Sequence, residues 1–473
     1  MLKFAVALGT TLALATAAQA QQPGEAAFRA LYKELVETNT TFSAGDCTLA
    51  AQRMAARLKT AGFPDTDLTV FVPPGRPKDG GLVAVYPGKD PKAKAMLLLA
   101  HIDVVEAKRE DWERDPFKLV EENGYFYARG ASDDKAQASI WTDLLIRFKR
   151  EGYTPRRTVK VALTCGEEGG GQLNGATWLA QNRRELIDAA FALNEGAGGT
   201  FDPNGKPVVH NIQAGEKTFR NYIVEATNAG GHSSRPTPDN AIYDLAGALE
   251  RISRLEFPVQ FNDANRGYFS RMAAVVGGEE GAAMTRLVTD PADKAADAVL
   301  RRNPGYRSMM GTTCVATMLE GGHASNALPQ RARATVNCRV FPGVPAEDVR
   351  QALVKAVDNP RLSVTLQALP GGSGPTQTGE APRLTPQVLG PIETVSAQMW
   401  PGVPVIPLLQ AGGTDAGALI SVGIPTYGVS GIFYDADLGR IHGLNERIGV
   451  KSLLDAREFS YRLIKLYADA KAP

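Results

Sequence analysis

The feature that most constrains the fold of this chain is the alternation of continuously apolar stretches with helix-like ones. Strand-like segments that are apolar through their middles lie at residues 80–88, 94–105, 158–168 and 189–199. Segments with helical spacing lie at residues 26–38, 49–63 and 136–152. A strand without polar alternation is buried on both faces, which is typical of a parallel sheet covered by helices. The sequence therefore predicts an α/β domain with a mostly parallel central sheet.

The pattern changes near Gly215, where a second and smaller unit begins. Its strand-like and helix-like segments lie at residues 218–228, 239–255, 313–322, 333–341, 346–358 and 362–369. This set is typical of an α+β, ferredoxin-like layer of antiparallel strands backed by two helices. Gly and Pro then cluster in residues 370–382, and the first pattern returns.

We therefore predict that the smaller unit, residues 215–375, is inserted into the larger one, residues 21–214 and 376–473. A polar and helical insert at about residues 260–311 is expected to sit in the smaller unit and to alter access to the site.

Residues 1–20 are predicted to be a cleaved export signal. They combine an early Lys3, a short apolar run and an end at Ala18 to Ala20 that suits signal peptidase. The alternative is an uncleaved anchor, but the run is short for a bilayer. No later stretch is long and apolar enough to span one, so we expect an exported protein, periplasmic or secreted, without stable membrane insertion.

The charge balance limits the kinds of partner that this protein can bind, and the cysteines limit the disulfides that it can form. The 473 residues include 52 basic and 51 acidic side chains, a balance that gives no overall field for nucleic acid or an anionic membrane. We therefore expect a small-molecule partner. Cys314 and Cys338 lie on two strand-like runs that could fold back on each other, so a disulfide between them is a hypothesis. Cys165 is interpreted as a buried, small apolar residue.

Acidic and histidine side chains stand where the apolar strands end. His101 and Asp103 follow the segment at 94–100, Glu167 and Glu168 end the segment at 158–168, and Glu195 lies in the segment at 189–199. The carboxyl ends of parallel strands meet at one edge of a sheet, which is where reactive groups of open α/β sheets lie. So much negative charge at one edge requires neutralisation.

A pair of divalent cations would neutralise this set. Asp133 in a Gly-led loop and His442 near the C-terminus complete it. We expect His101 and Glu195 to bind one ion, Glu168 and His442 to bind the other, and Asp133 to bridge them. Three carboxylates and two neutral imidazoles then face four positive charges. Zinc takes both ligand types readily, so the expected cofactor is two Zn²⁺ per subunit, with Mn²⁺ or Co²⁺ as alternatives.

The adjacent carboxylates Glu167 and Glu168 cannot share one role. If Glu168 faces the metal, Glu167 is left to take a proton from the attacking water and pass it to the leaving nitrogen. Asp103 lies two residues after His101 on the same strand face and is expected to orient its imidazole.

Short motifs spread along the chain carry a resemblance to a known family. In order they are HID, ARGASDDK, CGEEGG, LNEG, GGHSSRP, GGHASNALP, GGTDA and IHGLNE. The set resembles the M20 family of metallopeptidases and amidohydrolases, which includes carboxypeptidase S, aminoacylase and carnosinase-like enzymes. The resemblance covers essentially the whole mature chain.

The resemblance implies a zinc-exopeptidase-like catalytic domain carrying a lid domain that in many members also forms a homodimer. By position it assigns metal contacts to the same five residues and the base role to Glu167. It also implies a cis peptide bond between Asp133 and Asp134. In the lid motif GGHSSRP, His232 is implied to stabilise the oxyanion, often in the active site of the partner subunit.

Substrate contacts are implied as well. Asn326 and Arg339 look like the family's grips on a substrate carboxylate, and an Arg fork suits that group. Gly413 and Thr414 look like a backbone and hydroxyl contact to substrate. The GGTDA loop is one residue shorter than the common Gly-Gly-Thr-Ser-Asp-Ala, which spares the ligands but weakens any assignment of substrate by analogy.

The expected activity is zinc-dependent hydrolysis of an amide (peptide) bond in small substrates with a free carboxylate, such as dipeptides, by a carboxypeptidase or dipeptidase. One alternative is a deacylase of N-acyl amino acids. Another is a metal-bearing binding protein of the cell envelope without turnover. The Glu pair argues against the latter, because binding alone has no use for a base beside a metal.

Overall fold

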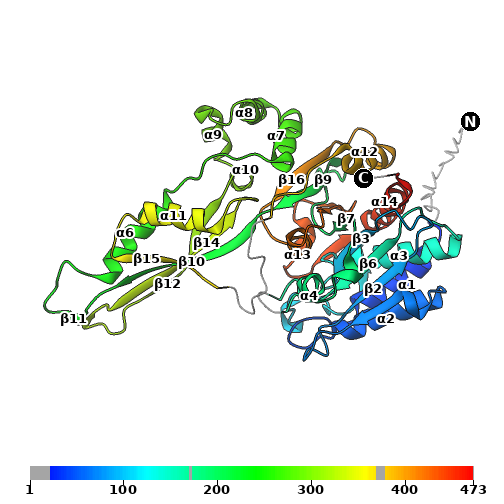
Figure 1. The fold of residues 1–473 in the computed structure, drawn as a ribbon, viewed down its shortest axis with the longest axis horizontal. Helices are drawn as coiled ribbons and strands as arrows, with labels where there is room; N and C mark the ends of the chain where they lie inside the picture. The colour runs from blue at the N-terminus through cyan, green and yellow to red at the C-terminus, as the bar shows by residue number, and fades with distance from the viewer. Residues whose placement is uncertain (1–21, 170–172, 369–378, 472–473) are drawn as a thin grey trace, which may run out of the picture.

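The computed structural model describes residues 22–169, 173–368 and 379–471, so the predicted export signal lies outside the described residues. Ten strands in these residues form one large mixed sheet (Figure 1). In spatial order they are β1 (Leu68–Phe71), β2 (Gly81–Tyr86), β6 (Val159–Thr164), β3 (Met96–His101), β7 (Phe191–Asn194), β17 (Thr426–Gly428), β9 (Pro207–Glu216), β8 (Gly199–Phe201) and β18 (Phe433–Tyr434), with β16 (Val405–Gln410) paired to β9.

The centre of this sheet is parallel, as predicted. β3 runs parallel to both β6 and β7, and β7 runs parallel to β17. Antiparallel pairs flank this centre, β2 with β6 on one side and β9 with β17 on the other. The carboxyl ends of β6, β3 and β7 therefore lie side by side at one edge.

Helices cover both faces of the large sheet. The helices on one face are α1 (Glu25–Val36), α2 (Cys47–Thr60), α3 (Lys135–Glu151), α12 (Pro386–Met399) and α14 (Val450–Asp469). Those on the other are α4 (Gly175–Asn182), α5 (Arg184–Ile187) and α13 (Ala416–Ser421). Both faces of β3 are thus buried, which explains why its sequence is apolar without alternation.

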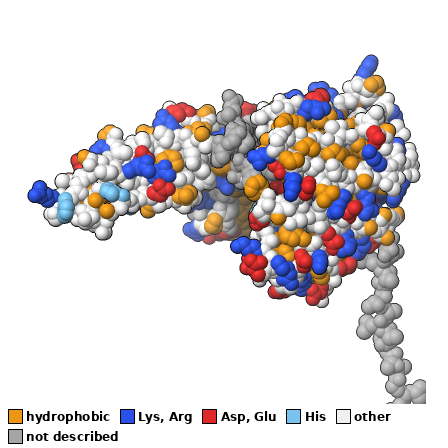
Figure 2. Space-filling model, turned by 90° about the horizontal axis from the view of Figure 1, so that it is seen from below, with side chains coloured by type: hydrophobic (Ala, Val, Ile, Leu, Met, Phe, Trp, Pro, Cys, Tyr) orange, Lys and Arg blue, Asp and Glu red, His pale blue; other side chains and the backbone are white. Residues whose placement is uncertain are grey.

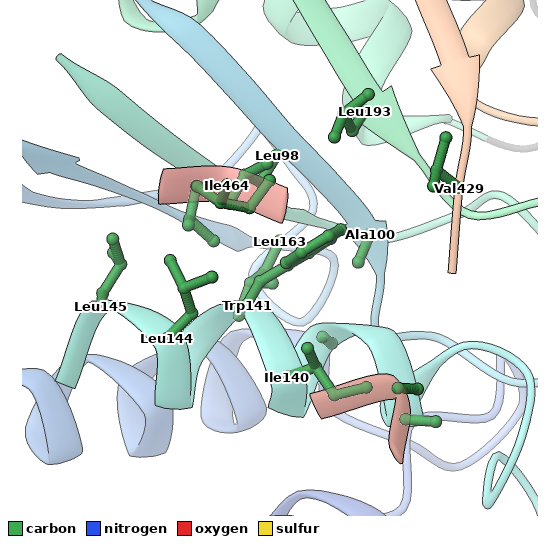
Figure 3. Packing of buried hydrophobic residues seen from close by; sticks show 14 of the residues in the cluster. Leu98, Ala100, Ile140, Trp141, Leu144, Leu145, Leu163, Leu193, Val429 and Ile464 are labelled. Atoms are coloured by element: carbon green, nitrogen blue, oxygen red, sulfur yellow. The ribbon is translucent and has the colours of Figure 1, made fainter. Parts of the chain in front are cut away.

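Large apolar side chains fill the space between β3 and α3. Leu98 and Ala100 of β3 face Trp141 and Leu144 of α3 (Figure 3). Trp141 is 1% exposed, and its indole N–H donates to the backbone carbonyl oxygen of Leu99 at 3.3 Å. Complete burial of an aliphatic side chain is worth about 1.5–3 kcal/mol, so this layer holds the strand ends of the site in place.

A second, four-stranded antiparallel sheet forms an arm that projects from the main body (Figures 1 and 2). Its elements are β12 (Thr313–Gly321), β14 (Arg331–Val340), β10 (Thr218–Thr227) and β15 (Leu362–Leu366), with α6 (Ala241–Ser253) and α11 (Ala346–Val357) on one face. The fold is the α/β sheet with an α+β lid that the sequence predicts. The hypothesised disulfide between Cys314 and Cys338 is present and joins β12 to β14.

The helical insert lies elsewhere than expected. It comprises α7 (Asp263–Val276), α8 (Gly278–Thr289), α9 (Lys294–Leu300) and α10 (Pro304–Met309). α7 packs on β16 and β9 of the large sheet, where Arg271 donates to the carbonyl oxygen of Val405 at 2.7 Å. Gly267 permits this approach, because a Cβ there would lie 2.6 Å from Pro407. The expectation that the insert sits in the lid is therefore wrong: it packs on the large sheet, and its helices share a core of their own to which Leu408 of β16 contributes.

One buried lysine marks the passage between the two sheets. β9 and β10 are separated only by Lys217, whose side chain is 1% exposed. Its Nζ donates to the carbonyl oxygens of Ser308 at 2.8 Å and Gly311 at 2.7 Å and to the Thr313 hydroxyl at 3.0 Å. Burial lowers the pKa of Lys217 to about 7. The predicted boundary between residues 214 and 215 falls inside β9, just before this point.

Small sheets complete the fold. β19 (Arg447–Gly449), β5 (Tyr125–Tyr127) and β4 (Val120–Glu122) form one, and β11 (Gly231–His232) with β13 (Ala327–Leu328) forms another at the end of the arm. Basic and acidic side chains are interspersed over the face in Figure 2. Among the described helices, none combines the length and the apolar character needed to cross a membrane.

Candidate metal centre

The predicted metal-binding side chains meet at the carboxyl ends of β3, β6 and β7. His101 is the last residue of β3, and Glu195 directly follows β7. Glu168 lies four residues beyond the end of β6. Because β3 pairs with both other strands, these three side chains converge on one edge of the sheet.

Asp133 stands between the two histidines. Its Oδ1 lies 3.1 Å from Nε2 of His101, and its Oδ2 lies 3.1 Å from Nε2 of His442. The Nε2 of His101 is also 3.6 Å from Glu195 Oε2, and that of His442 is 2.8 Å from Glu168 Oε1. The result is two groups of three potential ligands that share Asp133. Imidazole nitrogens and carboxylate oxygens in this arrangement fit two divalent cations of the zinc, manganese or cobalt type.

The pKa values of these groups reflect crowded negative charge. Burial and the charge of Glu195 raise the pKa of Glu167 to about 10, and burial raises that of Glu195 to about 7. Hydrogen bonds to Asp133 and Glu168 raise the pKa of His442 to about 10. Burial alone would raise the pKa of Asp133, but the hydrogen bonds from the two histidines lower it.

Bound divalent cations would favour the deprotonated forms of these carboxyl and imidazole groups. Within the described residues, the carboxylates predicted to bind metal form their ion pairs with histidine and not with lysine or arginine. The surrounding carboxylates accordingly raise the pKa values of His101 and His442. Bound metal ions would supply positive charge themselves and require the same groups to be deprotonated.

Asp103 links His101 to the Glu pair. Its Oδ1 accepts the backbone N–H of Glu167 at 3.3 Å, and its Oδ2 accepts that of Glu168 at 2.9 Å. The Nδ1 of His101 lies 3.1 Å from the carbonyl oxygen of Asp103. A ring N–H donated there leaves Nε2 free to face Asp133. The backbone carbonyl of Asp103 makes the nearer contact with His101, and Oδ1 of its side chain lies 3.6 Å from the same Nδ1 while also anchoring the Glu pair.

A disulfide holds the segment before the Glu pair. Cys165 is bonded to Cys47, the first residue of α2, across a sequence separation of 118 residues. Cys165 is buried in the apolar core as predicted, but it is one half of a disulfide that was not predicted. The pairing had no local sequence signal, because the two cysteines become neighbours only when α2 packs against the central sheet.

The GGTDA loop is held by the carboxylate of Glu216, a residue that was not among the predicted site residues. Oε2 of Glu216 accepts the backbone N–H of Thr414 at 3.0 Å and its hydroxyl at 2.9 Å. The Thr414 hydroxyl also accepts a hydrogen bond from Asn194 at 3.1 Å. In this structure the predicted substrate-contacting groups of Thr414 are thus engaged by the protein itself. Gly413 is exposed at the wall of the cleft.

A cleft of about 1220 Å³ opens over the predicted metal-binding residues and extends to the base of the lid. It is lined by Glu167, His442 and Gly413 on the main body and by Arg339 and Phe219 on the lid. The Arg339 guanidinium lies 5.7 Å from the centre of the Phe219 ring. In the part of the chain that the structure describes, Arg339 has no ion-pair partner. It is therefore available to an anionic group in the cleft.

His232 and Asn326 lie away from this cleft. Both are exposed, His232 in β11 and Asn326 directly before β13, and the Asn326 carbonyl oxygen accepts the Ser233 N–H at 3.0 Å. β11 lies at the far end of the arm from β3 and β7 (Figure 1). One chain alone does not bring these side chains to the metal-binding residues, so their predicted roles require a second subunit.

Two further features of the loops concern Asp133. The peptide bond between Asp133 and Asp134 is cis, as the resemblance implies. Glu446, which sequence reasoning also missed, is buried and accepts the backbone N–H of Asp133 at 3.0 Å. Its sequence signal is its place at the end of the motif IHGLNE, four residues after His442, to which no role was assigned.

Comparison with known proteins connects this geometry to a protein family. The sequence model described as Peptidase family M20/M25/M40 matches residues 97–466. Human N-fatty-acyl-amino acid synthase/hydrolase PM20D1 is 28% identical over 413 residues, covering 85% of this chain and 80% of that protein. Probable carboxypeptidase S-like 2 of Dictyostelium discoideum is 25% identical over 395 residues, covering 81% and 74%.

Solved structures show the same fold. The M20 family metallo-carboxypeptidase Sso-CP2 from Sulfolobus solfataricus superposes with a TM-score of 0.68 at 19% identity. The alignment covers 93% of this chain and 99% of that one. The likeness thus extends over both the large sheet and the lid.

Proposed function

The chain belongs to peptidase family M20/M25/M40, a family of hydrolases, and from that membership we propose that it cleaves the amide bond of dipeptides or similar small peptides with a free carboxylate, as a carboxypeptidase or dipeptidase. The observation that carries this proposal is Arg339, which lines the same cleft as the metal-binding residues and has no ion-pair partner among the described residues. An Arg fork in that position suits the carboxylate of a substrate.

We assign the metal contacts to His101, Asp133, Glu168, Glu195 and His442, with zinc as the metal. When bound, two such ions polarise the scissile carbonyl and make water a good nucleophile at neutral pH. The donor set supports this assignment, because its oxygens and nitrogens already face one another within the distances of two ligand groups.

Glu167 acts as the general base. Its carboxylate takes a proton from the attacking water and delivers it to the leaving nitrogen, so that the products are a free carboxylate and a free amine. Asp103 fixes the backbone of Glu167 during this transfer. His232 of a second subunit would donate to the developing oxyanion, and Asn326 of that subunit would help to hold the substrate.

A homodimer through the lid would bring these groups together. Exposed apolar side chains on β12 support such an interface: Val315 is 60% exposed, Met318 62% and Leu319 68%. An outer strand with unpaired backbone groups is also suited to pairing with a second copy. We further propose export to the periplasm or the medium, which the two disulfides support, because such bonds persist in oxidising compartments.

A deacylase of N-acyl amino acids is the second candidate. The cleft wall includes the apolar side chains of Phe219, Leu408, Leu438 and Ile441, which could cover an acyl chain. The human relative named N-fatty-acyl-amino acid synthase/hydrolase PM20D1 supports this alternative. Membership in a hydrolase family disfavours the remaining one, a binding protein without turnover.

The experiment that tests the proposal is hydrolysis of a matched panel by the purified protein. The panel pairs dipeptides with N-acyl amino acids that share the same C-terminal residue, and it is assayed before and after metal chelation and zinc add-back. Release of amino acids from the dipeptides that chelation stops and zinc restores is the expected result. Preferential release from the acylated partners would favour the deacylase, and no release from any substrate would refute both activities.

A further inference from the structure

Glu446 makes an unusual set of contacts for a residue outside the predicted ligand set. It is 0% exposed. Its Oε1 accepts the backbone N–H groups of Ser132 at 2.8 Å and Asp133 at 3.0 Å. Its Oε2 accepts the backbone N–H of Gly130 at 3.0 Å and Nη1 of Arg129 at 2.7 Å. One carboxylate therefore organises the whole loop that carries the bridging Asp133.

Arg129 extends this contact to the loop of His442. Its Nη2 donates to the carbonyl oxygen of Gly443, which directly follows His442, at 3.0 Å. The Arg129 side chain is 3% exposed, so solvent does not weaken the ion pair with Glu446. The Glu446–Arg129 pair thus joins the segments that carry two of the metal-binding side chains.

We propose that Glu446 is a positioning residue that sets how Asp133 faces both histidines and thereby determines the affinity of the metal pair. This inference rests on the two-metal centre of the proposed function. Asp133 can bridge only if its two oxygens stay symmetric between His101 and His442, which lie 3.1 Å away on either side. The backbone N–H of Asp133 is one of the donors that Glu446 accepts, so a change at Glu446 moves the bridge itself.

The chemistry of four donors explains why a carboxylate is needed. Each oxygen of Glu446 accepts two hydrogen bonds, and every partner is a donor. A glutamine amide has one oxygen and an NH₂ group, so the NH₂ would face two donors whichever way it turned. Glu446→Gln is therefore nearly identical in shape and yet incompatible with the loop.

The chain offers a matched control in a second buried ion pair. Asp143 of α3 accepts a hydrogen bond from Arg457 of α14 at 2.7 Å, and the two side chains are 5% and 1% exposed. This pair touches none of the metal-binding residues. Asp143→Asn should lower the melting temperature, as loss of one partner of a buried ion pair does, without altering the metal-binding geometry.

The test is zinc titration of the metal-free full chain, wild type and variants, against a competing chromogenic chelator. Wild type should bind two zinc ions. Glu446→Gln should bind one or both ions about 10–100-fold more weakly, as expected when a group that supports a ligand is lost. The zinc affinity of Asp143→Asn should stay within about twofold of wild type, even if its melting temperature falls as much as that of Glu446→Gln.

A second variant keeps the test decisive if Glu446→Gln does not fold. Arg129→Lys keeps the charge but has one nitrogen in place of the guanidinium fork, whose Nη1 bonds to Glu446 and whose Nη2 bonds to the Gly443 carbonyl, so it should weaken zinc binding in the same direction. Wild-type zinc affinity in every one of these variants that folds would overturn the positioning role of Glu446 and leave the proposed function intact. A wild-type chain that binds no zinc would instead overturn the two-metal centre itself.

Discussion

The adjacent carboxylates Glu167 and Glu168 give the sharpest test of the mechanism, because they share a loop and an anchor but are assigned different work. Both backbone N–H groups bond to Asp103. The side chain of Glu168 lies 2.8 Å from His442, whereas Glu167 lines the cleft. Replacing either by Gln preserves the shape and the backbone contacts and removes only the charge.

The two variants should fail in different ways. Glu167→Gln should lower kcat by about 10²–10⁴-fold, which is the usual contribution of a general base and corresponds to about 3–5 kcal/mol. It should retain both zinc ions, since the five predicted ligands are unchanged. Glu168→Gln should lose zinc, and excess zinc should restore part of its activity.

The assay is kcat and KM on a cleaved dipeptide together with the zinc content of the same samples after dialysis. The competing assignment is that Glu167 binds metal, because His101, Glu167 and Glu168 also lie close enough to form a ligand group. If Glu167→Gln loses zinc and recovers near-wild-type turnover in excess zinc, then Glu167 is a ligand and the assignment of the base is wrong.

Three further predictions address substrate binding and stability. Arg339→Met should raise KM for free dipeptides about 10–100-fold, as loss of a charge-assisted hydrogen bond predicts, and should leave C-terminally amidated dipeptides unaffected; equal effects on both would exclude the carboxylate grip. Burial lowers the pKa of His210 to about 3, so between about pH 6.5 and 3 the unfolded chain binds a proton that the folded chain does not, and stability is lost as pH falls. The unfolding free energy of His210→Asn, measured with urea, should therefore fall less steeply with decreasing pH than that of wild type, by about 1.4 kcal/mol per pH unit. Equal pH dependence of the two unfolding free energies would contradict this. Replacing both Cys47 and Cys165 by Ser should lower the unfolding free energy by up to about 5 kcal/mol, given the separation of 118 residues, and unchanged denaturant midpoints would refute it.

The strands and their reactive ends could be predicted because the evidence for them is local. An apolar run such as Met96–His101 reports burial on two faces, and the polar residue at its end reports an edge of the sheet. The set of motifs in order along the chain then supports the assignment of Asp133 and His442 to the same site. The Cys314–Cys338 pair could be predicted for a similar reason, because its two strands lie close together in the sequence and pair with the cysteines opposite each other.

The features that escaped prediction depend on contacts between distant segments. Glu216 and Glu446 look like ordinary acids in polar loops, and only the folded chain surrounds them with N–H donors. The insert likewise contains amphipathic helices whose partner, β16, lies about a hundred residues further along the chain. Periodicity reveals that such a helix has an apolar face but not what will cover it.

Lys217 has a mechanical consequence for the arm. Its ammonium group ties the step from β9 to β10 to the segment that leads into β12, through Ser308, Gly311 and Thr313. Two of the segments that join the arm to the main body are thus fastened to each other at one point. Any displacement of the arm relative to the large sheet would have to move these two segments together or withdraw the buried Lys217 nitrogen from its three oxygens.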